Sequence, residues 1–221
     1  MIKKLLITLA LVFGLAAQAV AAENFTSGWT ETDPNSRLSQ TSTRTTWTGI
    51  THGEDAYLQR NSAISLSGDY DIAFDFKATS ASGDDGDSFQ VLYFTGGGEA
   101  SVYAYAINST GKLYVGLDWY VDPDYLSDEN NTTLSQNTTY YARYKRTSGV
   151  MTLDIYSTDA NRIAQTSPLV SLSISPGSTP TFTGLYCPTT YDDGKSVTHT
   201  GYLENLDLAF VPATRRIMII P

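Results

Sequence analysis

Apolar and polar residues alternate along most of this chain, which is the pattern expected of half-buried β-strands. No window carries the apolar i, i+3, i+4, i+7 stripe of an amphipathic helix, and the alternating runs are separated by turns rich in Gly, Ser and Asp. The pattern predicts strands at Gly28–Glu31, Thr45–Thr48, Ala56–Gln59, Asp71–Ala78, Ser88–Phe94, Ser101–Asn108, Leu113–Val121, Thr139–Arg146, Met151–Ser157, Leu169–Ile174, Thr181–Tyr186 and Gly201–Val211.

Many short strands about ten residues apart indicate an all-β fold rather than a parallel α/β sheet. The composition agrees, because the chain has 15 Tyr and many Thr, residue types that suit a pleated sheet. The chain shows neither an internal repeat nor a low-complexity linker. We therefore expect a single domain, a two-sheet antiparallel β-sandwich of the jelly-roll type.

One hairpin can be predicted with its register. A two-residue turn at Ser148-Gly149 joins the strands on either side of it and sets their pairing. It places Tyr144 opposite Leu153 on the core face, and Arg143 opposite Asp154, where we expect a cross-strand ion pair. A three-residue turn with a bulge at Gly149 is the alternative, and it would shift this register.

The first 22 residues have the layout of a secretory signal peptide: two lysines, the apolar run Leu5–Leu15 and a small-residue cleavage site ending at Ala22. The apolar run is shorter than the roughly 20 residues that cross a bilayer, and no later segment is longer, so we expect no membrane span. The remainder divides into an expected domain at 23–211 and a tail at 212–221 whose role the sequence does not indicate. The expected protein is therefore secreted or periplasmic.

Net charge and cysteine content narrow the partners and the chemistry. The formal charge is -9 and becomes -11 when the two leader lysines are removed, so the chain repels phosphate backbones and nucleic acid is not expected as a partner. Cys187 is the only cysteine, which excludes an intramolecular disulfide. Its place in an apolar strand predicts a buried, inert thiol.

The strand Leu113–Val121 carries the most informative pattern for function. Its alternate residues Leu113 to Val121 are apolar and predict a core face, whereas the opposite face holds Tyr114, Asp118 and Tyr120. Aromatic rings with polar tips beside a carboxylate suit the apolar face and the hydroxyls of a sugar ring. These three residues are the candidate carbohydrate-binding residues, and Trp47 is a weaker candidate because it can equally be core. The structural alternative is a sheet face covered by a loop.

Several segments resemble one family. These are Trp29-Thr-Glu-Thr-Asp33, Leu38-Ser-Gln-Thr41, Ala56-Tyr-Leu-Gln-Arg60, Tyr70–Lys77, Ser88–Phe94, the Tyr-Tyr-x-Arg-Tyr-x-Arg pattern at 140–146 and Gly201–Phe210. Together they are similar to concanavalin A-like lectin/glucanase domains, which include laminin G-like domains, binding modules, glucanases and polysaccharide lyases. The resemblance implies a jelly roll whose concave sheet commonly binds glycans, but the fold alone does not choose among these functions.

Neither catalytic signature of that family is present. Its glucanases carry Glu-x-Asp-x-x-Glu, and no glutamate of the expected domain has another within five residues. Its lyases carry Arg-x-Glu and Gln-x-His strands, whereas Gln90 is followed by Val91 and Leu92. The two histidines, His52 and His199, stand in polar, turn-like segments and are expected to be surface loop residues rather than bases.

The leading prediction is therefore a non-catalytic, lectin-like module that binds a glycan or polysaccharide. A glycoside hydrolase or lyase remains the alternative, in which two distant carboxylates would converge, with Asp118 and either Asp122 or Glu204 the pairs to inspect. A structural or adhesive surface protein with a protein partner is a further alternative.

Calcium is the cofactor that the sequence raises. Ca²⁺ prefers clustered oxygen ligands on short loops, and Asp84, Asp85 and Asp87 form the best such cluster, between two predicted strands. A second acidic cluster, at 122–129, is also expected to be a loop. Acidic turns are equally common on the rim of a net-negative β protein, so this site stays a hypothesis.

Overall fold

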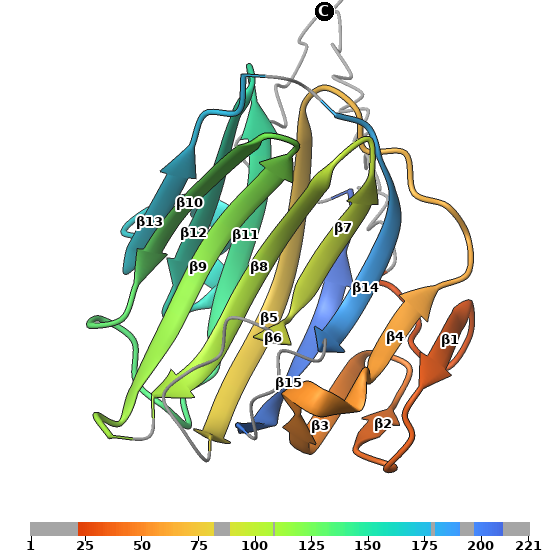
Figure 1. Cartoon of the computed structure of the whole chain (residues 1–221). Helices are drawn as coiled ribbons and strands as arrows, with labels where there is room; N and C mark the ends of the chain where they lie inside the picture. The colour runs from red at the N-terminus through yellow and green to blue at the C-terminus, as the bar shows by residue number, and fades with distance from the viewer. Residues whose placement is uncertain (1–21, 82–88, 108, 178–179, 191–196, 210–221) are drawn as a thin grey trace, which may run out of the picture.

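The computed structural model describes residues 22–81, 89–107, 109–177, 180–190 and 197–209, and it shows two antiparallel sheets packed face to face (Figure 1). Sheet A, nearer the viewer in Figure 1, has the order β1 (Trp29–Thr32), β4 (Tyr57–Arg60), β14 (Phe182–Thr190), β7 (Leu92–Gly96), β8 (Glu99–Ile107), β9 (Lys112–Val121) and β10 (Asp124–Asn130), with β6 (Phe89–Gln90) also paired to β14. Sheet B, behind it, has the order β13 (Val170–Ile174), β12 (Val150–Tyr156), β11 (Tyr140–Thr147), β5 (Tyr70–Ala81), β15 (Thr198–Asp207), β3 (Arg44–Thr51) and β2 (Leu38–Gln40). The expected all-β sandwich is confirmed.

The core lies between the sheets and is built from the alternate positions of each strand. On β9, Leu113, Val115, Leu117 and Trp119 are fully buried, as the alternation predicts. Because successive side chains point to opposite faces, the remaining residues of β9 lie on the outer face of sheet A. This face is where the candidate carbohydrate-binding residues were expected.

The predicted register of the β11–β12 hairpin is confirmed, with Arg143 opposite Asp154 and Tyr144 opposite Leu153. The hydrogen-bonded ion pairs are diagonal, however, while the charge of Asp154 still favours the charged form of the opposite Arg143. Arg143 Nε donates to Asp71 Oδ1 on β5 at 2.8 Å, and Lys145 Nζ donates to Asp154 Oδ2 at 2.5 Å. Both pairs are diagonal, because long side chains reach past the directly opposite position to a neighbour two residues along.

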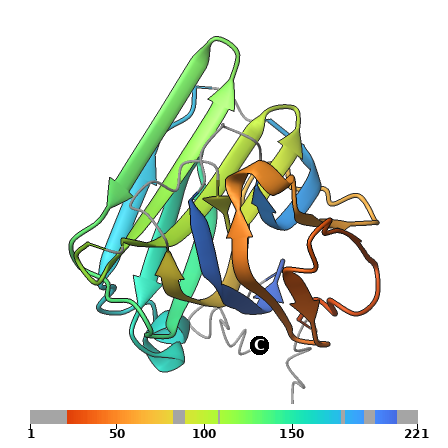
Figure 2. The ribbon, with the colours of Figure 1, turned by 60° about the horizontal axis from the view of Figure 1, so that its bottom comes forward.

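Several elements differ from the sequence prediction, among them β2, which lies in a segment for which no strand was predicted. The segment 122–129, expected to be an acidic loop, contains β10, whose side chains alternate between the two faces of sheet A. The predicted strand Ser88–Phe94 is interrupted at Val91 and forms two strands, β6 and β7. A short helix, α1 (Asp159–Ala164), lies in a segment for which no element was predicted, and Figure 2 shows it beside β11 and β12.

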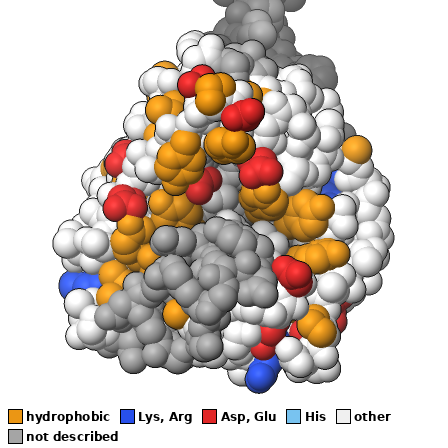
Figure 3. Space-filling view, in the orientation of Figure 1, with side chains coloured by type: hydrophobic (Ala, Val, Ile, Leu, Met, Phe, Trp, Pro, Cys, Tyr) orange, Lys and Arg blue, Asp and Glu red, His pale blue; other side chains and the backbone are white. Residues whose placement is uncertain are grey.

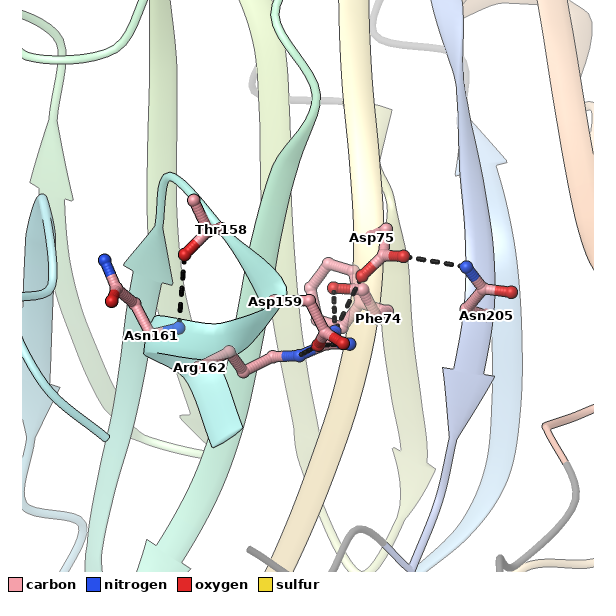
Figure 4. A network of polar contacts seen from close by, with 7 residues as sticks. All are labelled: Phe74, Asp75, Thr158, Asp159, Asn161, Arg162 and Asn205. Carbon is pink, nitrogen blue, oxygen red and sulfur yellow. Dashed lines mark hydrogen bonds and ion pairs between the residues drawn. The ribbon is translucent and has the colours of Figure 1, made fainter. Parts of the chain in front are cut away.

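A buried polar network fastens α1 to the outer face of sheet B (Figure 4). Thr158 caps the helix, since its Oγ1 accepts from the N–H of Asn161 at 3.2 Å. Arg162 Nη1 then donates to Asp75 Oδ1 on β5 at 2.7 Å, and Asn205 Nδ2 on β15 donates to Asp75 Oδ2 at 2.7 Å. The guanidinium and the amide together satisfy a carboxylate that is almost completely buried.

The two histidines are not surface residues, so that expectation is wrong. His52 follows β3 in the short 3-10 turn η1 (His52–Glu54), and His199 lies on β15, which pairs with β3. Both are buried, with their Nε2 atoms 2.7 Å apart and their rings stacked. The Thr and Gly neighbours made these segments look like turns, but strand pairing turns the imidazoles inward.

Residues 1–21 of the expected leader and the whole expected tail, 212–221, lie outside the described residues. Within the part that is described, no helix combines the length and the hydrophobicity that crossing a membrane requires. Cys187 is fully buried on β14, as predicted, and burial raises the pKa of its thiol well above the ordinary value.

Candidate functional site: a tyrosine-lined acidic hollow on sheet A

A hollow of about 780 Å³ lies on the outer face of sheet A. In Figure 3, apolar and acidic side chains, coloured orange and red, lie next to one another over β8, β9 and β10. We call this feature the tyrosine hollow, because five of its lining residues are tyrosines. It is lined by Gln90, Tyr93, Glu99, Ser101, Tyr103, Tyr114, Asp118, Tyr120, Tyr125, Glu129 and Thr189.

The three main residues predicted from sequence are brought together here. Tyr114, Asp118 and Tyr120 occupy alternate positions of β9 and all line the tyrosine hollow. Strand alternation was sufficient to place them on one face, because their common face depends on β9 alone.

The neighbouring strands supply two carboxylates that sequence reasoning did not select. Glu99 on β8 lies opposite Tyr120, and Glu129 on β10 lies opposite Gly116. Each is therefore a diagonal neighbour of Asp118, a relation that separates backbone positions by about 7–8 Å. Three carboxylates thus cross the floor of the hollow on three adjacent strands. These carboxylates become neighbours only through the register of β8, β9 and β10. The sequence predicts a loop in place of β10, so it does not reveal that Glu129 lies near Asp118.

Tyr103 lies across the floor because Gly116 has no side chain. A Cβ at Gly116 would stand 2.0 Å from Cζ of Tyr103, so the ring occupies the place of that missing side chain. Only 8% of Tyr103 is exposed, and its hydroxyl has no hydrogen-bond partner among the described residues. Because Tyr103 lines the hollow, its hydroxyl is placed to bond to a ligand or to water there.

The aromatic rings form a platform of graded depth. Tyr105 and Tyr114, which are opposite each other on β8 and β9, stack with ring centroids 5.0 Å apart and planes 9° apart. Tyr120 and Tyr125, opposite each other on β9 and β10, are 41% and 60% exposed and are the most accessible rings of the hollow. The accessible ring faces thus lie at the rim, on Tyr120 and Tyr125, while Tyr114 is stacked against Tyr103 and Tyr105.

Burial controls the ionisation of the site. It raises the pKa of Asp118 to about 6, although Ser101 N–H and Oγ donate to Oδ1 at 2.9 and 2.7 Å and favour the ionised form. The charge of Glu99 raises this pKa further. Burial also raises the pKa of Tyr93 and of Tyr103 far above neutrality, so both hydroxyls remain protonated and can donate hydrogen bonds.

A second hollow of about 430 Å³ adjoins the first and shares Glu99 and Tyr120 with it. It lies toward the β7–β8 and β9–β10 turns and is lined also by Gly97 and Asp122. Asp122 belongs to this second hollow, whereas Glu204 is on sheet B, bonded to Arg44. Neither pair proposed from the sequence, Asp118 with Asp122 or with Glu204, forms the row of carboxylates.

Trp47, the weaker candidate, does not line the site. It is 1% exposed, lies on β3 of sheet B and packs against Phe89, with ring centroids 5.3 Å apart. Its neighbours on β3 put its ring on the core face, so Trp47 is a core residue and not a sugar-binding one.

The proposed calcium ligands Asp84, Asp85 and Asp87 lie outside the described residues. Within those residues, no group of three His, Cys, Asp or Glu side chains is placed to hold a metal ion.

Comparison with known proteins identifies the architecture. The structure is similar to the cellulose induced protein Cip1, with a TM-score of 0.53 and 14% identity over 85% of this chain and 96% of that one. It is also similar to the CBM2 module of Lactobacillus casei BL23 phage J-1 evolved Dit, with a TM-score of 0.52 and 9% identity over 87% and 97% of the two chains. The chain has the concanavalin A-like jelly-roll fold.

The alginate lyase from Alteromonas sp. 272 shares this jelly roll, with a TM-score of 0.51 and 11% identity over 82% of this chain and 93% of that one. No protein-family model matches the chain, and no curated protein sequence matches it. At identities this low, the likeness establishes the jelly roll and leaves function to the residues of the site.

Proposed function

We propose that this protein is a secreted or periplasmic carbohydrate-binding module that holds a glycan in the tyrosine hollow without cleaving it. The hollow itself is the observation that carries the proposal. Its volume falls within the roughly 300–1,000 Å³ typical of small-ligand sites, and its walls combine five tyrosines with a few convergent polar groups.

The chemistry of the lining suits sugar rings. The exposed rings of Tyr120 and Tyr125 offer flat apolar surfaces to the C–H faces of a pyranose, and Tyr114 also lines the hollow. Asp118 supplies acceptor oxygens for sugar hydroxyls, and the unpartnered hydroxyl of Tyr103 supplies a donor from below. The similar folds include the CBM2 module, which is consistent with a binding role for this jelly roll.

A lyase acting on a uronic acid polymer is less well supported than a binding module. Such an enzyme needs groups that neutralise the substrate carboxylate, and the tyrosine hollow presents three carboxylates of its own. No Lys, Arg or His is among the described residues that line it. The shared fold with an alginate lyase therefore does not carry over to lyase chemistry in this chain.

Glycoside hydrolysis is the second candidate, and one observation favours it. Inverting and retaining hydrolases use two carboxyl groups, one of which is an acid with a raised pKa. Asp118, with its pKa raised to about 6, lies beside Glu99 and Glu129 on adjacent strands. An assay for released sugars decides between this candidate and the binding module.

The test is a glycan array and an insoluble-polysaccharide pull-down on residues 23–221, with calcium and with chelator, and with the supernatant assayed for soluble sugars. We expect retention without release, and loss of retention on the double substitution Tyr114→Ala and Tyr120→Ala. The double variant should have a lower melting temperature, because Tyr114 stacks on Tyr103 and Tyr105. The single substitution Tyr120→Ala, at an exposed ring, should weaken retention at nearly unchanged melting temperature. Tyr202→Ala, which removes a tyrosine from sheet B, is the matched control and should retain binding.

Retention by the double variant would refute the site, and released oligosaccharides would favour the hydrolase. Loss of binding under chelator would add a metal requirement. The absence of both binding and release would favour a protein partner instead.

A further inference from the structure

The charge of the tyrosine hollow is strongly one-sided. Glu99, Asp118 and Glu129 line it, and no basic residue among the described residues does. The ion pairs of the described residues lie on sheet B and along the β3–β4 side of the sandwich, as in Arg143 with Asp71. Lys112 shares a face with Asp118 but stands six residues away, about 20 Å along the strand. The hollow thus holds three negative charges without a cation from these residues.

Concave surfaces lined by charges of one sign concentrate their field and attract counter-charged ligands. Burial has already removed part of the hydration of Asp118, which is why its pKa is raised. A neutral sugar placed over these three carboxylates would displace more of their water without supplying a positive charge to compensate for the lost hydration. A ligand carrying positive charge would compensate the carboxylates as it desolvates them.

The tyrosines point to the same ligand chemistry independently of the carboxylates. An ammonium group over the face of an aromatic ring is attracted by the ring quadrupole. Tyr120 and Tyr125 offer such faces at the rim, where they are 41% and 60% exposed. Tyr114 lines the hollow on the other side of Asp118 along β9. Tyr103, of which 8% is exposed, also lines the hollow, and its hydroxyl has a lone pair that can accept from an ammonium N–H as well.

We propose that the tyrosine hollow selects glycans that carry free amino groups, of the polyglucosamine type, over their N-acetylated and uronic counterparts. This selectivity rests on the proposed glycan-binding function. The ammonium groups pair with the carboxylates of Asp118 and Glu129, while the sugar rings pack on the tyrosines between them. The negative net charge of the whole chain adds long-range attraction for such a polycation.

The test compares three ligands of equal length: a chitosan pentamer, a chitin pentamer and a mannuronate pentamer. They differ chiefly in whether each ring carries an ammonium, an acetamide or a carboxylate. Isothermal titration of the full secreted chain is run at about pH 6.5, where Asp118 is mainly ionised. We expect the chitosan pentamer to bind at least about tenfold more tightly than the chitin pentamer, with no binding of the mannuronate pentamer and weakening at high salt.

Variants connect the selectivity to the site. Asp118→Asn and Glu129→Gln should each weaken chitosan binding by about tenfold or more, and should weaken it by a larger factor than they weaken chitin binding. Asp124→Asn is the matched control. It removes the same charge from β10, but position 124 points to the face opposite Glu129, so it should leave the affinity for chitosan unchanged.

The outcomes separate this proposal from the function on which it rests. Equal affinity for the chitosan and chitin pentamers would overturn the selectivity and leave glycan binding intact. Chitosan binding that Asp124→Asn weakens as much as Asp118→Asn does would assign the attraction to overall charge and overturn the site. The absence of binding to every glycan tested would reject the proposed function and the selectivity together.

Discussion

Replacing Asp118 with Asn should make the protein more stable at neutral pH, although it removes a residue from the tyrosine hollow. Burial raises the pKa of this carboxyl from 3.8 to about 6, so the folded protein disfavours its ionised form. Asn has nearly the same shape, and its carbonyl oxygen can accept the two hydrogen bonds that Ser101 donates. The substitution therefore removes a charge that destabilises the fold and keeps the local contacts.

The size of the effect follows from proton linkage. The interval between 3.8 and about 6 corresponds to about 3 kcal/mol, and solvent reaching Asp118 through the open hollow reduces the expected gain to about 1–3 kcal/mol. Because the folded pKa lies above the unfolded one, the folded state binds the proton more tightly between these two values. Wild type therefore loses stability relative to the variant as the pH rises through about 6, and the two converge below about pH 4.

The assay is urea denaturation of wild type and Asp118→Asn, followed by tryptophan fluorescence at intervals from about pH 4 to pH 8. The free-energy difference should grow with pH and level off above about pH 7. Ser101→Ala should act in the opposite direction, because it removes the hydrogen bond from Ser101 Oγ, which favours the ionised carboxylate, and keeps the one from the backbone N–H. A difference that does not change with pH, or a variant less stable than wild type at pH 7, would refute the burial argument.

Three further substitutions test other parts of the structure. Gly116→Ala should displace the ring of Tyr103, since the new Cβ would stand 2.0 Å from Cζ of that ring. The variant should stay folded and show weaker glycan retention in the pull-down. Unchanged retention would contradict the role given to Tyr103. Arg162→Leu should lower the free energy of unfolding by about 3–5 kcal/mol, because it leaves Asp75 buried without its cation, and adding Asp75→Asn should recover part of the loss in urea titrations. Trp47→Ala should also lower the free energy of unfolding by about 3–5 kcal/mol, while the folded fraction still binds glycan. Loss of binding by protein that is still folded would show that Trp47 contributes to the site.

Features that depend on one strand or one hairpin were predictable from the sequence. The two-residue periodicity of β9 placed Tyr114, Asp118 and Tyr120 on one face, and the Ser148-Gly149 turn set the β11–β12 register. The same local reasoning could not choose the partners of long side chains. It paired Arg143 with its direct opposite, although β5 on the other side of β11 offers Asp71 within reach.

Features that need two or more separate strands were missed. Glu129 was assigned to an acidic loop, because charged residues are usual in turns and the apolar side of β10 is weak. His52 and His199 were placed on the surface, since only the β3–β15 pairing brings their rings into contact. The sequence does not decide between a core and a site position for Trp47, because a short alternating strand does not reveal which of its faces is buried.

The sequence by itself determined the all-β class, the faces of the individual strands and the aromatic and acidic character of one face of β9. These properties depend on side-chain periodicity and turn chemistry, which act over a few residues. The tertiary structure decided which strands became neighbours, and so brought Glu99, Tyr103 and Glu129 around Asp118. Such juxtapositions depend on register and sheet order, which arise from the simultaneous burial of both sheets and are not written in any single segment.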